Sequence, residues 1–196
     1  METTLDTKGA LLAVAARLFA GLGWRGTTTR RVAAAAGVNE VTVFRHFGSK
    51  ETLLQEAVAW SAAQDEFSPL PEVPGDVRTE LVAWAAAQHA IVQRKRAMMR
   101  TCLAEFEEHP GLARVACAKP MRSMEDAVRY LAAAQAAGTL PPAAALEGPV
   151  AMLMHSIFMD GMTRDVLPGC SPVAADEAIG IYVDVVLRAL GATEAA

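Results

Sequence analysis

Apolar residues recur every three to four positions along most of this chain, as in the stripe formed by Leu11, Ala15, Leu18, Phe19 and Leu22. Alanine, the best helix former, dominates the apolar residues, and runs of β-branched or aromatic residues that would indicate strands are scarce. Hydrophobic residues make up 53% and charged residues 20% of the 196, which excludes a disordered chain. The pattern therefore predicts an all-α fold.

The first third of the chain reads as short helices separated by tight turns. Thr27 and Ser49 are expected N-caps, and Gly37 can adopt the left-handed conformation that ends a helix and starts a turn. Two short helices joined by a turn of three to four residues that contains glycine form a helix-turn-helix unit. The expected helices are Thr7–Leu22, Thr28–Ala36, Asn39–His46 and Lys50–Gln64.

A proline-rich segment, Ser68–Asp76, marks the clearest boundary in the chain. We therefore expect a helix-turn-helix domain over residues 1–49, a connecting helix within 50–67, and a larger helical domain over 68–196. Ser171 before Pro172 is expected to cap the last helix. Five helices are expected beyond the boundary, for about nine in all: Asp76–Gln93, Arg94–Glu108, Gly111–Ala137, Ala143–Leu167 and Pro172–Leu190.

Charge is distributed unevenly along the chain. Residues 1–50 have a formal charge of +4, whereas residues 51–196 have a charge of −8. A basic module on an acidic body indicates a nucleic-acid contact at one end, although ordinary surface charge would give the same asymmetry.

The order of residues in the basic module is more specific than its charge. The stretch Gly26–Leu54 contains Val32-Ala33, the turn Ala36-Gly37-Val38, the pair Phe44 and Phe47, and Ser49-Lys50. In these elements and their order it resembles the DNA-binding signature of the tetracycline-repressor (TetR) family. The C-terminal part resembles that family only in length and expected number of helices. The resemblance implies a dimeric repressor that binds operator DNA and releases it when a small ligand binds.

By this resemblance, Arg30 and Glu40 match base-reading positions, and the chemistry of the side chains agrees. Arginine suits guanine O6 and N7, and a glutamate can accept from cytosine N4. Val41 and the Thr42 methyl group can pack on a thymine methyl group. The positions that match phosphate contacts are Thr27, Thr29, Phe44, His46 and Lys50. Phe44 stands where tyrosine is commoner, and the acidic Glu40 faces a polyanion. The alternative interpretation of any one of these residues is that it is an ordinary solvated surface residue or a core residue.

Eight of the nine methionines lie between Met98 and Met162, and methionine lines adaptable apolar surfaces. Helical spacing puts several of them on common faces with polar neighbours, which is typical of a small-molecule site. A well-filled core is the alternative for any one of these residues. The expected ligand-binding residues are Trp84, Gln88, Met121, Met124, His155 and Met159.

The last two expected helices carry apolar stripes that are too extensive for one chain's remaining helices to cover, which predicts a homodimer. Packing against their two-fold mates would make a four-helix interface. The expected interface residues are Met154, Phe158, Met162, Ile179, Tyr182, Val183, Val186 and Leu190.

Other site classes find little support in the sequence. We expect no metal site, no cofactor and no catalysis. No histidine stands three or four residues from another histidine or from a cysteine, and no phosphate loop or oriented triad appears. Three widely spaced cysteines and the absence of a long apolar run predict a reduced, cytoplasmic protein without a membrane span. The partners expected are double-stranded operator DNA, a small-molecule effector and a second copy of the chain.

Two alternatives to a ligand-responsive repressor stay open at this point. One is a DNA-binding regulator that answers to a protein partner or acts as an activator, without a small-molecule ligand. The other is an enzyme or transport protein with a degenerate helix-turn-helix.

Overall fold

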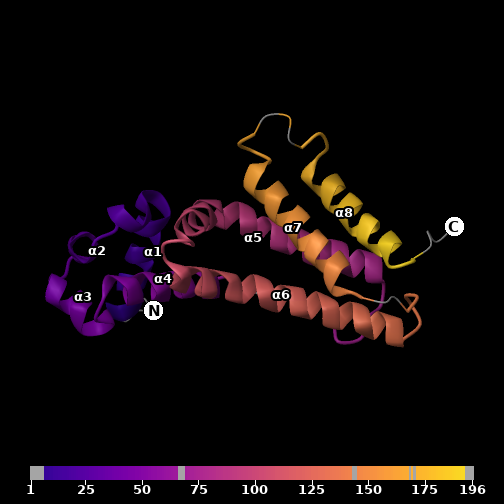
Figure 1. Cartoon of the computed structure of the whole chain (residues 1–196), viewed down its shortest axis with the longest axis horizontal. Helices are drawn as coiled ribbons and strands as arrows, with labels where there is room; N and C mark the ends of the chain where they lie inside the picture. The colour runs from indigo at the N-terminus through magenta and orange to yellow at the C-terminus, as the bar shows by residue number, and fades with distance from the viewer. Residues whose placement is uncertain (1–6, 66–68, 143–144, 168, 170, 193–196) are drawn as a thin grey trace, which may run out of the picture. The chain divides into compact units, whose positions relative to one another are not determined.

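The computed structural model describes residues 7–65, 69–142, 145–167, 169 and 171–192 (Figure 1). Its described residues form α-helices and connecting turns without strands, as predicted. The helices are α1 (Thr7–Gly26), α2 (Thr29–Ala36), α3 (Glu40–Phe47), α4 (Lys50–Ala63), α5 (Val77–Glu105), α6 (Pro110–Ala136), α7 (Glu147–Thr163) and α8 (Ala175–Ala189).

The chain divides into two compact units. Residues 1–66 and 97–119 form the first, and residues 67–96 and 120–196 form the second. Helices α5 and α6 therefore contribute one part of their length to each unit. The predicted domain limits at 49 and 67 stay a prediction.

Helix capping explains the short elements of the first unit. Asn39 Oδ1 accepts from the Val41 N–H, and Ser49 Oγ accepts from the Thr52 N–H. Gly37 has φ 70° and ψ 27°, the left-handed conformation that the turn between α2 and α3 requires. The N-cap of α2 is Thr28, whose hydroxyl accepts from the Arg31 N–H, and not Thr27 as predicted.

The core of the first unit lies between α1, α2, α3 and α4 and the parts of α5 and α6 that belong to this unit. It contains Leu11, Phe19, Val32, Val43 and Phe47, among others, all buried. Val43 and Phe47 recur at i and i+4 on α3, so one face of that short helix is fixed against the core and the opposite face is left to solvent.

The second unit has its own core, to which parts of α5 and α6 and all of α7 and α8 contribute. Within it, α7 and α8 pack against each other (Figure 1). Gly161 on α7 permits close approach to α5, because a Cβ atom there would lie 2.7 Å from Val92 Cγ1.

Two predictions about this unit are wrong. Asp76–Gln93 and Arg94–Glu108 are one helix, α5, because no glycine or proline interrupts the chain between them. Ser171 does not cap α8, which starts at Ala175; its hydroxyl donates instead to Asp160.

Candidate functional site

Several of the side chains that the sequence predicted for DNA contact are exposed on the helix-turn-helix. Arg30 on α2 and Val41, Phe44 and His46 on α3 are exposed, and Thr42 is half-buried. Val41 is 63% and Phe44 48% exposed, although Val43 and Phe47 of the same helix are buried. These predicted residues are therefore accessible to a partner on α2 and α3.

Glu40 and Thr29 are linked to each other. The Thr29 hydroxyl donates to Glu40 Oε1 at 2.6 Å, joining the first residue of α2 to the first residue of α3. The second oxygen of the Glu40 carboxylate is still available to a donor such as cytosine N4. The sequence showed both residues but not the bond between them.

Two residues predicted to hold phosphate are engaged inside the unit. Thr27 is buried, and its hydroxyl donates to the Gly23 carbonyl at 2.8 Å, so the structure does not support its side chain as a phosphate contact. Lys50 Nζ donates to the Trp24 carbonyl at 2.6 Å and lies 4.9 Å from the centre of the Trp24 ring. Burial lowers the Lys50 pKa, which the nearby Glu105 partly opposes.

Trp24 is the centre of a cluster that sequence reasoning missed. Its ring stacks on His109 with the ring centres 3.5 Å apart, and its backbone N–H donates to Glu105 Oε1 at 3.1 Å. These contacts join the end of α1 to the turn between α5 and α6 within the first unit. The i, i+4 spacing of Glu105 and His109 was the available sequence signal.

The same turn brings potential metal ligands together. Ligand atoms of Glu105, Glu108 and His109 lie within 4.8 Å of one another, a group that the spacing of histidines and cysteines alone does not reveal. Glu105 already accepts from Trp24, and Glu108 is exposed.

The six predicted ligand-binding residues fall into two groups. Trp84 and Gln88 are buried on α5, and Met124 is half-buried against the same core. Met121, His155 and Met159 are exposed, so the prediction that all six line one enclosed site is wrong for these three. A depression of about 410 Å³ at the turn after α6 is lined by none of the six.

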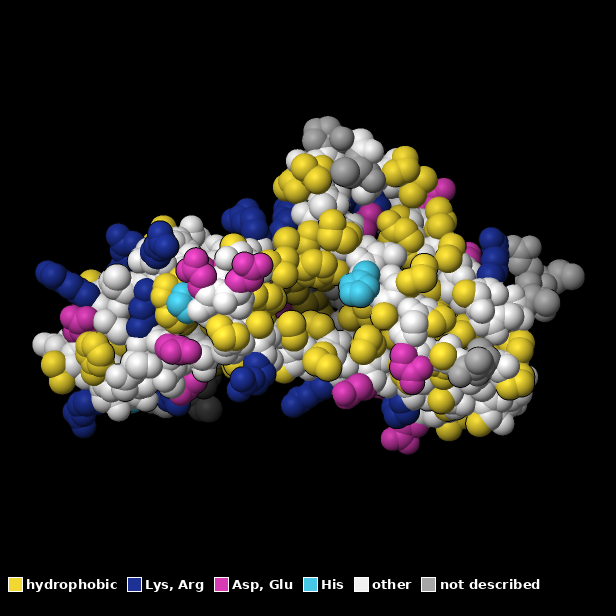
Figure 2. Space-filling model, in the orientation of Figure 1, with side chains coloured by type: hydrophobic (Ala, Val, Ile, Leu, Met, Phe, Trp, Pro, Cys, Tyr) yellow, Lys and Arg dark blue, Asp and Glu magenta, His cyan; other side chains and the backbone are white. Residues whose placement is uncertain are grey.

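Four of the predicted dimer residues are buried within this chain's own second unit. Ile179, Val183, Val186 and Leu190 are core residues there, so the premise that one chain cannot cover them is wrong. Tyr182 is half-buried, as are Met154, Phe158 and Met162. The apolar side chains that α7 and α8 expose are different ones: Met152, Met159, Ile181 and Val185. Figure 2 shows hydrophobic side chains spread over α7 and α8.

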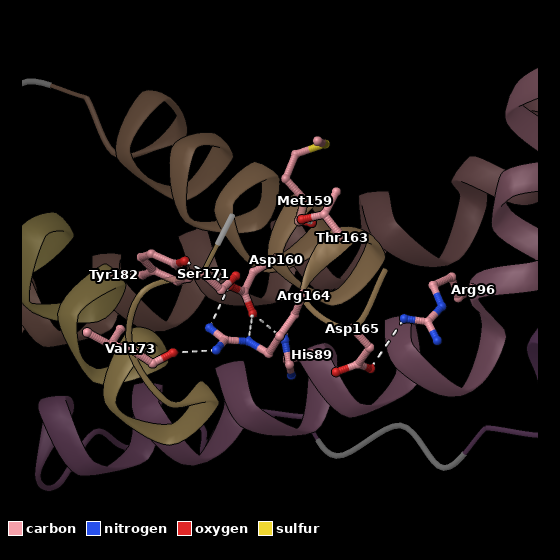
Figure 3. A network of polar contacts seen from close by, with 10 residues as sticks. All are labelled: His89, Arg96, Met159, Asp160, Thr163, Arg164, Asp165, Ser171, Val173 and Tyr182. Atoms are coloured by element: carbon pink, nitrogen blue, oxygen red, sulfur yellow. Dashed lines mark hydrogen bonds and ion pairs between the residues drawn. The ribbon is translucent and has the colours of Figure 1, made fainter. Parts of the chain in front are cut away.

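A buried carboxylate organises the second unit (Figure 3). Asp160 on α7 accepts from Arg164 at both oxygens, at 2.8 and 2.7 Å, and from His89 on α5 at 2.7 Å. Ser171 and the Tyr182 hydroxyl of α8 donate to it at 3.1 Å each. Burial would raise the Asp160 pKa, but these hydrogen bonds outweigh it and the pKa is lowered. One side chain thus ties α5, α7, α8 and the segment between the last two.

A compact helical unit with a short exposed helix after a glycine turn defines a helix-turn-helix DNA-binding protein. The comparisons with known proteins give the family. Residues 11–57 match the bacterial regulatory proteins of the tetR family, and residues 79–192 match the C-terminal domain of the AefR-like transcriptional repressors. The chain belongs to the TetR family of transcriptional regulators.

Relatives and solved structures agree with this assignment. The chain is 34% identical over 76 residues to the uncharacterized regulator YvkB of Bacillus subtilis and 48% identical over 46 residues to the repressor KstR2 of Rhodococcus jostii. The match to YvkB covers 39% of this chain and 40% of YvkB. The match to KstR2 covers 24% of this chain and 22% of KstR2, so each match spans less than half of the relative's length. A TetR regulator from Agrobacterium tumefaciens has the same fold, with a TM-score of 0.75 at 17% identity over 93% of both chains.

Another solved structure, the flavonoid-responsive regulator FrrA, has a TM-score of 0.72 at 24% identity over 94% of both chains. The family's members are DNA-binding regulators of transcription and usually act as dimers. Among the described residues of this chain, no helix combines the length and apolar character that a membrane crossing needs.

Proposed function

We propose that this protein is a ligand-responsive transcriptional repressor that binds a palindromic operator as a homodimer. A small, mainly apolar effector releases it from DNA. The observation that carries the DNA-binding part is the exposure of Arg30 on α2 and of Val41 and Phe44 on α3, a short helix whose Val43 and Phe47 are buried. A short helix of this kind is what enters a major groove.

We propose that Arg30 contacts a base edge and that the surrounding residues position the helix on the DNA. Arg30 is exposed on α2, as a bidentate contact to guanine O6 and N7 demands. Arg30→Ala should cost about 1–3 kcal/mol on the cognate operator and relax the preference at one base pair in each half-site.

The experiment uses fluorescence anisotropy with a labelled duplex from upstream of the gene and a scrambled duplex of the same length, at two salt concentrations. Equal losses on both duplexes for Arg30→Ala would make Arg30 a phosphate contact. No preference of the wild-type protein for the upstream duplex would refute operator binding there.

We propose that the dimer forms through the exposed faces of α7 and α8. Met152 and Met159 recur at i and i+7, and Ile181 and Val185 at i and i+4, so each helix offers an apolar strip. Pairing with the same strips of a second copy would remove them from water and make a symmetric four-helix contact.

Light scattering tests the dimer. The double variant Ile181→Glu with Val185→Glu should be monomeric at micromolar concentration and lose operator binding. Val73→Glu is the matched control, because Val73 is 82% exposed on a loop of the same unit. A monomeric wild-type protein, or a double variant that stays dimeric, would contradict this interface.

The effector is proposed to bind among the buried Trp84 and Gln88 and the half-buried Met124. Release requires that the effector bind the DNA-free form more tightly than the DNA-bound form. A panel of neutral apolar compounds, with flavonoids included because FrrA is named as responsive to them, should contain compounds that raise the melting temperature and lower the anisotropy of the operator complex. If no compound does both, a regulator that answers to a protein partner becomes the better account.

A further inference from the structure

Trp84 carries a hydrogen-bond donor that the folded chain leaves without a partner. Among the side chains that the structure describes, Trp84 Nε1 is the one buried nitrogen or oxygen with no hydrogen-bond partner. The residue is 3% exposed and belongs to the core of the second unit. Because an unpaired buried donor is costly, native proteins rarely keep one without a ligand or an ordered water.

A buried indole brings a polar N–H into the core together with its aromatic surface. A phenylalanine would supply an aromatic ring to the same core without a polar atom to satisfy. An indole whose N–H is enclosed and unpaired is therefore better explained by an acceptor that arrives from outside the chain than by its contribution to the core.

Two further neutral polar groups lie close along the same elements. Gln88 follows Trp84 by one turn of α5, and Ser123 of α6 donates to Gln88 Oε1 at 3.3 Å. Both side chains are buried. An O–H···O contact of 3.3 Å is long, so this pair can exchange its contact for one with a ligand at little cost.

The surroundings are apolar and adaptable. Met124 and Val128 of α6 are half-buried against the same core, and a methionine side chain changes shape easily when a molecule enters. The ionisable groups nearest along α5 are Glu80, one turn before Trp84, and His89, next to Gln88. Glu80 accepts from the Gly75 N–H and the Tyr130 hydroxyl, and His89 is bonded to Asp160. No free charge is thus offered to an ionic ligand by Trp84, Gln88, Ser123 or their described apolar neighbours.

We propose that Trp84 Nε1 donates a hydrogen bond to a carbonyl oxygen of a neutral, mainly apolar effector, and that Gln88 and Ser123 complete the polar end of the same site. This inference rests on the proposed effector response and gives its chemical class. It distinguishes carbonyl compounds from hydrocarbons of the same shape.

Matched probe pairs test the donor directly. The pairs are 2-acetylnaphthalene with 2-ethylnaphthalene and 4-phenyl-2-butanone with butylbenzene. The full chain is labelled with ¹⁵N at the indoles, and the Trp84 resonance is assigned from Trp84→Phe. We expect at least one ketone to bind about 5–10-fold more tightly than its hydrocarbon and to shift the Trp84 indole resonance.

Trp84→Phe should abolish the ketone preference while the affinity for the hydrocarbon stays within about twofold. Trp60→Phe, which changes a half-buried tryptophan of the first unit, is the control and should keep the preference. Equal affinities within both pairs, no binding of any probe at millimolar concentration, or an unmoved Trp84 resonance overturns the inference.

Operator release is measured separately, so the two proposals can fail independently. A ketone preference through Trp84 without operator release supports this site and refutes its role as the effector site. Release by compounds that neither shift Trp84 nor distinguish ketone from hydrocarbon keeps the proposed effector response and overturns both this inference and the placement of the effector beside Trp84.

Discussion

Replacing Asp160 with asparagine should destabilise the second unit far more than the same change at the surface. Asp160 is 3% exposed at its side chain and Arg164 is 12% exposed, so this pair is shielded from water. The asparagine of the variant would keep one acceptor oxygen but would present an amide N–H₂ to a guanidinium that has lost its counter-charge.

The size of the effect follows from this geometry. Removing one partner of a buried ion pair costs about 3–5 kcal/mol. Because the asparagine keeps one acceptor oxygen, we expect Asp160→Asn to cost about 3 kcal/mol, the lower end of this range. For a chain of this length, that corresponds to a fall in melting temperature of about 6–12 °C. Urea unfolding followed by circular dichroism measures the free energy.

Asp184→Asn is the matched control. Asp184 pairs with Arg78 at 2.7 Å on the surface of the same unit, and exposed pairs contribute little to stability. The variant should shift the urea midpoint much less than Asp160→Asn does. Similar shifts for the two variants would refute the argument that Asp160 holds α5, α7 and α8 together.

The same carboxylate predicts how stability depends on pH. Its pKa is lower in the folded protein than the ordinary value of 3.8, so it contributes stability that is fully present above that value and is lost as the pH falls through the folded pKa. As the pH is lowered below about 4, the free energy of unfolding should therefore decrease less steeply for Asp160→Asn than for the wild type. Parallel slopes would contradict the lowered pKa.

Four further substitutions test three separate features. Gly161→Ala should destabilise the protein by about 1–3 kcal/mol because the new methyl group would clash with Val92. Gly180→Ala makes only an ordinary van der Waals contact and should stabilise α8 by up to about 1 kcal/mol. Urea midpoints that move in the same direction for both variants would contradict these expectations. Lys50→Met removes the hydrogen bond to the Trp24 carbonyl and should lower the free energy of unfolding by about 1.5 kcal/mol, in addition to any loss of DNA affinity. A melting temperature equal to that of the wild type would mean that this bond does not stabilise the fold. Glu40→Gln should tighten binding to scrambled DNA about threefold, from about 0.7 kcal/mol of repulsion at roughly 6 Å from a phosphate in water; an unchanged affinity in the anisotropy assay would place the carboxylate away from the backbone.

Local signals allowed most of the helix-turn-helix to be predicted. Gly37, Asn39 and Ser49 act through their own backbone conformation or through a neighbour two or three residues away, so their effect is readable from the sequence. The burial of Val43 and Phe47 follows in the same way from helical spacing.

Contacts across long sequence separations were not readable. Trp24 meets Glu105 81 residues later, and no periodicity indicates which partner a given tryptophan finds. Helix α8 shows a second limit, since it is apolar on two faces. Val183 and Val185 differ by two positions, and only the packed structure decides that Val183 is core and Val185 is exposed. Asp160 did give a signal, an acid within an apolar helix with Arg164 four residues on.

The position of Asp160 bears on how an effector could act within the second unit. Trp84 and Gln88, proposed to meet the effector, precede His89 on the same helix, and His89 is bonded to Asp160. Asp160 in turn bonds to Tyr182 of α8, so a set of hydrogen bonds that starts at His89, the residue after Gln88, reaches the two proposed dimer helices. Directional bonds of about 3 Å do not stretch gradually, so a shift of α5 either carries α7 and α8 with it or breaks the set. A hundredfold loss of operator affinity corresponds to about 2.7 kcal/mol, which is comparable to the loss expected for Asp160→Asn. The set is therefore strong enough to transmit an effector signal to the dimer helices, and Asp160→Asn should weaken operator release at a saturating effector concentration more than it weakens effector binding.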